Sequence, residues 1–177
     1  MKKEYCNINY CIQDVPEQKN ANSNLVNLKI IDKHGKKEIA KKRDPLGLKG
    51  SNIFLTTDLS KLISCVFRQQ LQRNDISIAQ EAESNLTIQS IIEEIKVDYK
   101  RSLFSINIKA NISLHITILI DDKEVYSDRI CGEFSQESAV INIVNTENVL
   151  KESFKDLVNN IFINSSFINH LLNNISI

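Results

Sequence analysis

The side chains best placed to do chemistry lie in a basic stretch, where Lys and Arg residues are concentrated between Lys33 and Lys49. Its Lys41-Lys42-Arg43 run offers two chemistries, because lysines bind phosphate as point charges and Arg43 can hold a carboxylate through two parallel hydrogen bonds. No aromatic residues are interleaved and the glycines lack the spacing of a phosphate loop. We therefore expect a turn-rich loop over residues 36–50, either a contact for an anionic group or a solvated surface segment.

The other reactive side chains do not form a recognisable site. His34, His115 and His170 fall on three separate predicted elements, and none has a second ligand at helical or strand spacing. Asp121-Asp122 is typical of a turn between two strands. No nucleophile motif stands out, and the cysteines are too scattered for a zinc site or a disulfide framework. The sequence predicts no catalytic residue, no metal and no cofactor, and we expect the protein not to be an enzyme.

Charge and hydropathy narrow the class of protein. The chain of 177 residues carries 22 basic and 22 acidic side chains, so no overall field draws it to nucleic acid or to an anionic membrane, and any charge effect must be local. The sequence has no run of 18 or more apolar residues, which a membrane-spanning helix would require. Residues 1–23 are polar and are predicted to be a flexible leader, followed by a single α/β domain over residues 24–177.

One long alternating segment organises that domain. From Phe104 to Ile120 every even-numbered residue is apolar, whereas the odd-numbered residues up to Thr117 are all polar. A period of two predicts a β-strand with one face on the core and the other toward water. The segments on both sides, from Leu86 and up to Ser135, also alternate, and a change of phase near Ile91-Ile92 predicts a β-bulge. Turns at residues 100–102 and 121–123 join the three segments into an antiparallel meander.

Two further segments have helical periodicity. Thr56-Thr57-Asp58 is predicted to cap a helix that ends at residues 73–75, and Asn145-Thr146-Glu147 is predicted to cap a second one. A strand over residues 25–30 precedes the first helix. The order β-α-β-β-β-α predicts a two-layer α/β (α+β) sandwich, with a mostly meander antiparallel sheet and two helices on one face.

The end of the chain has a second candidate contact. After a break at residues 164–166, an apolar side of a short helix carries Phe167, Ile168, Leu171 and Leu172. This helix either docks on a partner or folds back on the sheet. We expect it to fold back, because unpartnered large apolar side chains at a terminus promote aggregation. The candidate partner-binding residues are Lys41, Lys42, Arg43, Phe167, Ile168 and Leu171.

A succession of soft motifs points to a known family. Val26-Asn27-Leu28 with Asp32 is followed by Arg43-Asp44 with Gly47 and Gly50, and then by Thr57-Asp58-Leu59 at the start of a helix that runs to Leu71. This succession resembles the YajG family of bacterial lipoproteins over about residues 25–172. The resemblance implies a small periplasmic protein that is anchored by lipid on an N-terminal cysteine and has no established enzymatic role.

The start of this sequence departs from that family pattern. Neither Cys6 nor Cys11 follows the apolar stretch and small residues that a lipidation site needs. Either a signal has been removed or this relative has lost its anchor. In the first case, residues up to 24 would serve as a spacer between the membrane surface and the domain.

Two classes of function follow from the resemblance. The first is a non-enzymatic protein-binding module of the cell envelope, an accessory component of a transport or secretion assembly in the periplasm at the outer membrane. Its partners would be other envelope proteins, with a membrane attachment through an N-terminal lipid and no contact with nucleic acid. The alternative is a periplasmic carrier that holds a lipid or other apolar ligand between sheet and helices. A cytoplasmic location is the alternative for the compartment, and a cytoplasmic enzyme is kept as a remote third option. The bulky apolar face of the main strand favours the first class.

Overall fold

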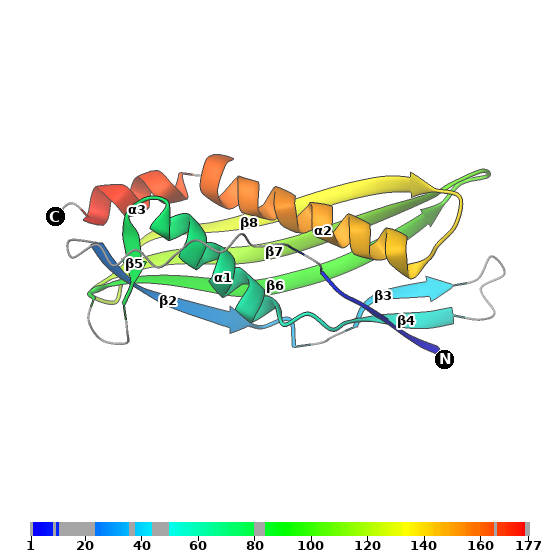
Figure 1. Cartoon of the computed structure of the whole chain (residues 1–177), viewed down its shortest axis with the longest axis horizontal. Coiled ribbons are helices and arrows are strands. Elements are labelled where there is room, and N and C mark those ends of the chain that lie inside the picture. Colours follow the sequence, from blue (N-terminus) through cyan, green and yellow to red (C-terminus); the bar gives the residue numbers. More distant parts are fainter. Residues whose placement is uncertain are drawn as a thin grey trace.

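Three long strands form the centre of the molecule, as Figure 1 shows. The computed structural model describes residues 2–8, 10, 24–35, 38–43, 50–79, 84–164 and 166–175. Strands β6 (Leu86–Arg101), β7 (Ile106–Ile120) and β8 (Lys123–Ser138) pair in antiparallel fashion. With β2 (Asn24–Asp32) and β5 (Ile76–Ile78) they make a sheet of order β5-β2-β6-β7-β8. The predicted meander is confirmed.

The alternation along β7 has the predicted effect on burial. Its even-numbered residues from Ile106 to Ile118 are buried, and Ile112 and Leu114 are fully enclosed. Phe104 does not belong to this face, because it lies in the hairpin turn before β7 and is almost fully exposed. The opposite face is less exposed to solvent than expected, since Ser113 and Thr117 on it are buried.

The sheet is mixed, and the prediction of a mostly antiparallel sheet is wrong for its first strands. Strand β2 runs parallel to both β5 and β6. Parallel neighbours need a long crossover, and here the chain between β2 and β6 builds a second sheet and a helix. A register shift between Ile92 and Glu94 confirms the bulge that the phase change near residues 91–92 predicts.

A second, small sheet contains two segments in which no strand was expected. It has the order β1-β4-β3 and consists of β1 (Lys2–Cys6), β4 (Gly50–Leu55) and β3 (Glu38–Arg43). The start of the predicted leader is therefore a strand, and Cys6 and Ile8 are buried. Most of the remaining leader, residues 9 and 11–23, lies outside the described residues. The basic run that we expected in a loop is strand β3, whose apolar residues are too few to show a period.

The helices begin and end close to the predicted positions. Helix α1 (Leu59–Gln72) starts at Asp58, whose carboxylate accepts a hydrogen bond from the Lys61 N–H. Helix α2 (Ile143–Asn159) starts earlier than expected, because Asn142 is its cap. A π-helical turn, η1 (Asn160–Asn164), leads to α3 (Phe167–Ile175). None of the helices in the described ranges is long and apolar enough to cross a bilayer.

The helices cover one face of the large sheet and also protect one of its edges. Helix α1 packs on β2 and β5, and α2 packs on β7 and β8 (Figure 1). Side chains of α2 and η1 form hydrogen bonds with backbone N–H and C=O groups on the outer edge of β8. The Ser153 hydroxyl donates to the Gly132 carbonyl at 2.7 Å, the Glu133 N–H donates to Asp156 at 2.9 Å, and the Asn160 amide donates to the Cys131 carbonyl at 2.8 Å. These bonds close the β8 edge to strand addition there.

Candidate functional site

A cleft of about 770 Å³ lies where the small sheet meets the large one, and β3 runs close to β6 there. One wall consists of consecutive residues of β6, from Glu93 to Tyr99, and the other of consecutive residues of β3, from Glu38 to Lys41. Successive side chains of a strand point to opposite faces, so a surface formed by the face of a strand would contain only alternate residues. A wall of consecutive residues is the backbone edge of the strand.

Both edges are without a strand partner on this side within the described part of the chain. β2 pairs with β6 only as far as Ile92, where the Lys33 N–H donates to the Ile92 carbonyl at 3.1 Å. Strand β3 is the outer strand of the small sheet and pairs only with β4. The N–H and C=O groups on an unpaired edge are available to another extended chain.

The cleft results from a local change of direction in the chain. The Asp32 carboxylate accepts a hydrogen bond from the His34 N–H at 2.9 Å, which ends β2 in a tight turn. Gly35 then adopts a φ of +58°, a left-handed conformation that suits glycine. The bulge at Glu93 lies opposite this turn. Together the two features end the β2–β6 ladder and leave the second half of β6 open.

Charged side chains surround the cleft and mostly neutralise one another. Arg129 of β8 contacts Glu93 at 2.8 Å and donates to the Ser113 hydroxyl at 3.3 Å. Lys41 lies 3.7 Å from Glu38 on the same strand. The surroundings are therefore polar and of mixed sign, which is suitable for a peptide and unsuitable for an acyl chain.

His34 lies where this cleft meets a second hollow of about 230 Å³. Its Nε2 atom is buried and has no hydrogen-bond partner among the described residues. A buried polar atom without a partner costs free energy, and a ligand group in the cleft would supply one. Ile95 is also shared by both hollows, so the floor at this junction is partly apolar.

The structure brings only part of the predicted contact surface to this cleft. Lys41 lines it, and its side chain is largely exposed. Lys42 lies next to Glu4 of β1, at 3.7 Å, and does not line the cleft. Arg43 ends β3, and its side chain lies outside the described residues.

The second predicted surface is part of the core. Phe167 and Leu171 are fully buried, and Ile168 is half-buried. Phe167 packs against Phe67 and Phe162 with ring centroids 6.0 and 5.9 Å apart. The terminal helix therefore folds back, as expected, although Leu172 on the same helix remains 38% exposed.

Most residues of the cleft cannot be identified from the sequence. The sequence pattern places Glu93, Glu94 and Arg129 on strands without a role, and His34 in a turn without a second metal ligand. The phase change near Ile91 was the available signal, because a bulge marks the place where a ladder can end.

The described residues contain no cluster of metal-binding side chains. Two of their thiols are held protonated, since burial raises the pKa of Cys6 to about 12 and also raises the pKa of Cys131. His115 contacts the Ser127 hydroxyl at 3.1 Å on the open face of the sheet. No carboxylate bonds to this histidine within the described part, so the pair lacks the third member of a catalytic triad.

Comparison with known families gives a clear match. The model of a family described as uncharacterized lipoproteins matches residues 12–171, which is most of the chain. The chain belongs to this lipoprotein family. The family agrees with the resemblance to YajG-like lipoproteins that the sequence motifs suggested, and it supports an envelope location. No curated protein matches the sequence.

Solved structures share the fold at low sequence identity. Protein XCC0632 from Xanthomonas campestris is 12% identical with a TM-score of 0.63, and the match covers 96% of this chain and 98% of that one. A putative neuraminyllactose-binding hemagglutinin homolog from Helicobacter pylori is 15% identical with a TM-score of 0.51, over 96% and 97% of the two chains. At these identities the likeness concerns the fold alone.

Proposed function

We propose that this lipoprotein is a non-enzymatic envelope module that binds another envelope protein by accepting an extended segment in the cleft between β3 and β6. It would serve as an accessory component of an envelope, transport or secretion assembly, on the periplasmic side of the outer membrane. The observation that carries the proposal is the pair of open strand edges that face the cleft.

Strand addition is a common mode of peptide recognition. The backbone of the bound segment supplies the affinity through ladder hydrogen bonds, and pockets beside alternate side chains supply the specificity. Here the edge of β6 from Glu93 to Tyr99 offers the ladder, and β3, which lies close to β6, would move aside as the segment binds. Lys41, Glu94 and Arg129 are placed to select charges on the segment.

The alternative of a lipid carrier has less support. A carrier needs an apolar cavity between sheet and helices, but that space holds fully buried rings such as Phe67, Phe154 and Phe167. The cleft itself is lined by paired charges. Burying an acyl chain there would remove water from these charges without replacing their hydrogen bonds.

Photo-crosslinking in living cells tests the proposal. A photoreactive residue would replace Lys41 or Glu94 in the cleft, and Lys61 on the exposed side of α1 would be the control position. We expect both cleft positions to give an adduct with the same protein, mapped to one short segment of it, and the control position to give none.

A charge variant adds a second measurement to this experiment. Reversing the cleft cations in Lys41→Glu/Arg129→Glu should reduce the adduct formed from Glu94, whereas Lys61→Glu should not. Adducts that form equally from Lys61, or cleft positions that give no protein adduct, would contradict the proposal. A stoichiometric lipid extracted from the purified protein would favour the carrier instead.

A further inference from the structure

The turn between β6 and β7 exposes two large apolar side chains. Leu103 is 92% exposed and Phe104 is 93% exposed, more than any other large hydrophobic residue in the described part of the chain. The turn is well ordered by hydrogen bonds between Ser102 and Ser105, including Ser102 N–H to the Ser105 carbonyl at 2.8 Å. The apolar pair is therefore presented on a firm hairpin.

Basic residues gather at the same end of the molecule. Lys100 and Arg101 precede the apolar pair, and the hairpin extends beyond β8 at the end of the long axis where the N-terminus and the end of β3 also lie (Figure 1). Lys2, Lys3 and Lys42 belong to the strands β1 and β3 that end there. Lys42 is paired with Glu4 at 3.7 Å, whereas Lys100 and Arg101 lie just before the apolar pair in the sequence.

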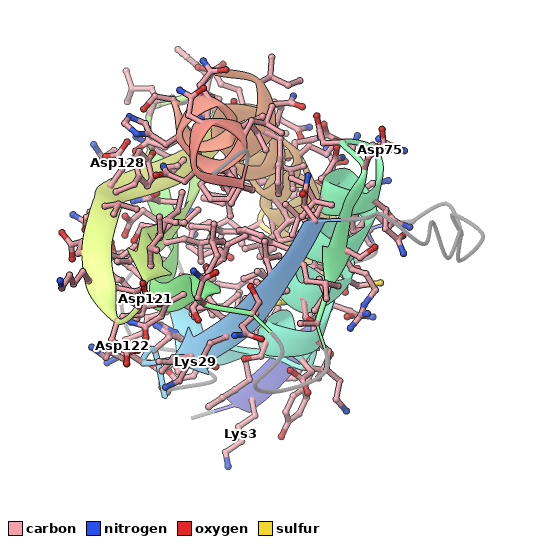
Figure 2. All side chains as sticks on the ribbon, turned by 90° about the vertical axis from the view of Figure 1, so that its left-hand side faces the viewer. Lys3, Lys29, Asp75, Asp121, Asp122 and Asp128 are labelled. Carbon is pink, nitrogen blue, oxygen red and sulfur yellow. The ribbon has the colours of Figure 1, made fainter. Side chains whose placement is uncertain are left out.

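Several aspartates gather at the opposite end, where Arg73 and Lys123 lie near them in the sequence, and the chain as a whole has no net charge. Figure 2 looks onto this end and shows Asp75, Asp121, Asp122 and Asp128 around its rim. Asp75, Asp121 and Asp122 belong to the turns that close the strands there. Separated charges of this kind orient a protein in front of a charged surface.

Additional apolar groups surround the basic end. Val140 and Val144 are exposed where β8 leads into α2. Tyr5 of β1 is also exposed, and its ring packs on Phe54 with centroids 5.9 Å apart. Lys3 lies over the same Phe54 ring. Aromatic and basic side chains together are typical of surfaces at the interface of a bilayer.

We infer that this end, defined by the Leu103–Phe104 hairpin and its surrounding cations, binds the surface of a bilayer that contains anionic lipids. Leu103 and Phe104 would enter the boundary between headgroups and acyl chains, while Lys100 and Arg101 contact the headgroups. A protein partner fits less well, because a narrow hairpin with two apolar residues offers less area than a stable protein interface requires. This inference concerns a surface separate from the cleft and does not depend on peptide binding there.

Vesicle binding by the full chain tests the inference. We expect flotation with vesicles of equimolar phosphatidylcholine and phosphatidylglycerol, and little flotation with phosphatidylcholine alone. The variant Leu103→Ser/Phe104→Ser should weaken binding by more than about tenfold, because two large apolar side chains no longer enter the interface. Ile163→Ser, which alters another highly exposed apolar residue far from this end, should bind like the unaltered protein. High salt should weaken all binding.

A fluorescent probe gives a second measurement, which reports directly whether the hairpin enters the bilayer interface. The chain contains no tryptophan, so Phe104→Trp and Ile163→Trp each introduce a single probe. We expect the emission of the first to shift to the blue when the phosphatidylglycerol vesicles are added, and that of the second to stay unchanged. Absence of vesicle binding at low salt, equal binding by the Leu103→Ser/Phe104→Ser variant, or an unshifted Phe104→Trp spectrum would overturn the inference.

Discussion

The distance between helix and sheet is set by one residue of β8. Gly132 lies beneath α2, and a Cβ atom added there would be 2.2 Å from the Ser153 carbonyl oxygen and 2.4 Å from the Leu157 nitrogen. Both are backbone atoms of a helix that also forms hydrogen bonds to this edge. The helix can therefore move away only by losing contacts along its whole length.

Gly132→Ala should reduce the free energy of unfolding by about 3 kcal/mol or more, since overpacking forces the backbone of α2 to shift. Gly35→Ala is the matched control. A Cβ at Gly35 would meet nothing closer than 3.8 Å, so its cost is that of the left-handed φ alone, about 1 kcal/mol. Urea unfolding curves measure both, and equal losses would contradict this account.

Two buried acids make the fold sensitive to alkaline pH. Burial raises the pKa of Cys6 to about 12 from its ordinary value of 9.0, and Glu147 adds to the effect. Burial also raises the pKa of Tyr99 to about 12 from 10.0, partly opposed by the hydrogen bond to Thr146 at 2.9 Å. Above their ordinary pKa values the unfolded chain releases these protons, whereas the folded chain retains them.

Stability should therefore fall as the pH rises from about 9 to about 12 and should not change through these groups below that range. Denaturant unfolding at a series of pH values measures the slope. Tyr99→Phe should make the slope shallower. Thiol labelling below this range should modify the exposed Cys65 well before the buried Cys6. An unchanged slope in Tyr99→Phe would show that Tyr99 does not contribute.

At the scale of elements, the hairpin between β7 and β8 closes in a conformation that its residues do not favour. Asp121 has a φ of +49° and Asp122 a φ of +62°, the left-handed pair of a type I′ turn. Aspartate tolerates this conformation better than most residues, and the sequence Asn-Gly adopts it best.

Asp121→Asn/Asp122→Gly should therefore keep the fold and raise its stability by about 0.5–1 kcal/mol. Asp122→Val should lower stability, because a β-branched residue is strained at positive φ. Thermal unfolding compares the two variants with the unaltered chain. A loss of stability in the Asn-Gly variant would mean that the aspartate side chains make contacts that the turn geometry does not require.

At the scale of the whole molecule, the first strand connects the start of the chain to the core. β1 pairs in parallel with β4, and the Ile8 N–H donates to the Thr57 hydroxyl at 2.7 Å. The Asn7 N–H donates to Glu147 of α2 at 2.8 Å. These contacts connect the start of the chain to the segment before α1 and to α2, so residues 2–8 are part of the folded unit.

Ile8→Ala should cost about 2–4 kcal/mol through lost burial, and Tyr5→Ala, at an exposed position of the same segment, should cost under about 1 kcal/mol. Urea unfolding measures both. If the two changes have equally small effects, the leader prediction for residues 1–23 would be correct after all, and the domain would be stable without its first strand.

The sequence by itself determined the features that depend on neighbours along the chain. Alternation over Ile106–Ile118 specifies a strand with one buried face, and Asp58 specifies where α1 starts. The bulge, the three-stranded meander and the return of α3 to the core were all predicted correctly. The family motifs likewise depend on local order along the chain, and the family match agrees with them.

Only the tertiary structure decided which strands lie side by side. Strands β1 and β3 are too short for a period of two to distinguish them from polar loops, and the parallel pairing of β2 with β6 joins residues far apart in sequence. The cleft follows from that pairing, because it begins where β2 leaves β6, and β3 lies near β6 beyond that point without pairing with it. His34 and Glu93 both line the cleft as a result of this topology. Periodicity shows which side of its own strand each residue occupies. The order of the strands depends instead on contacts between residues far apart in the sequence, which periodicity does not report.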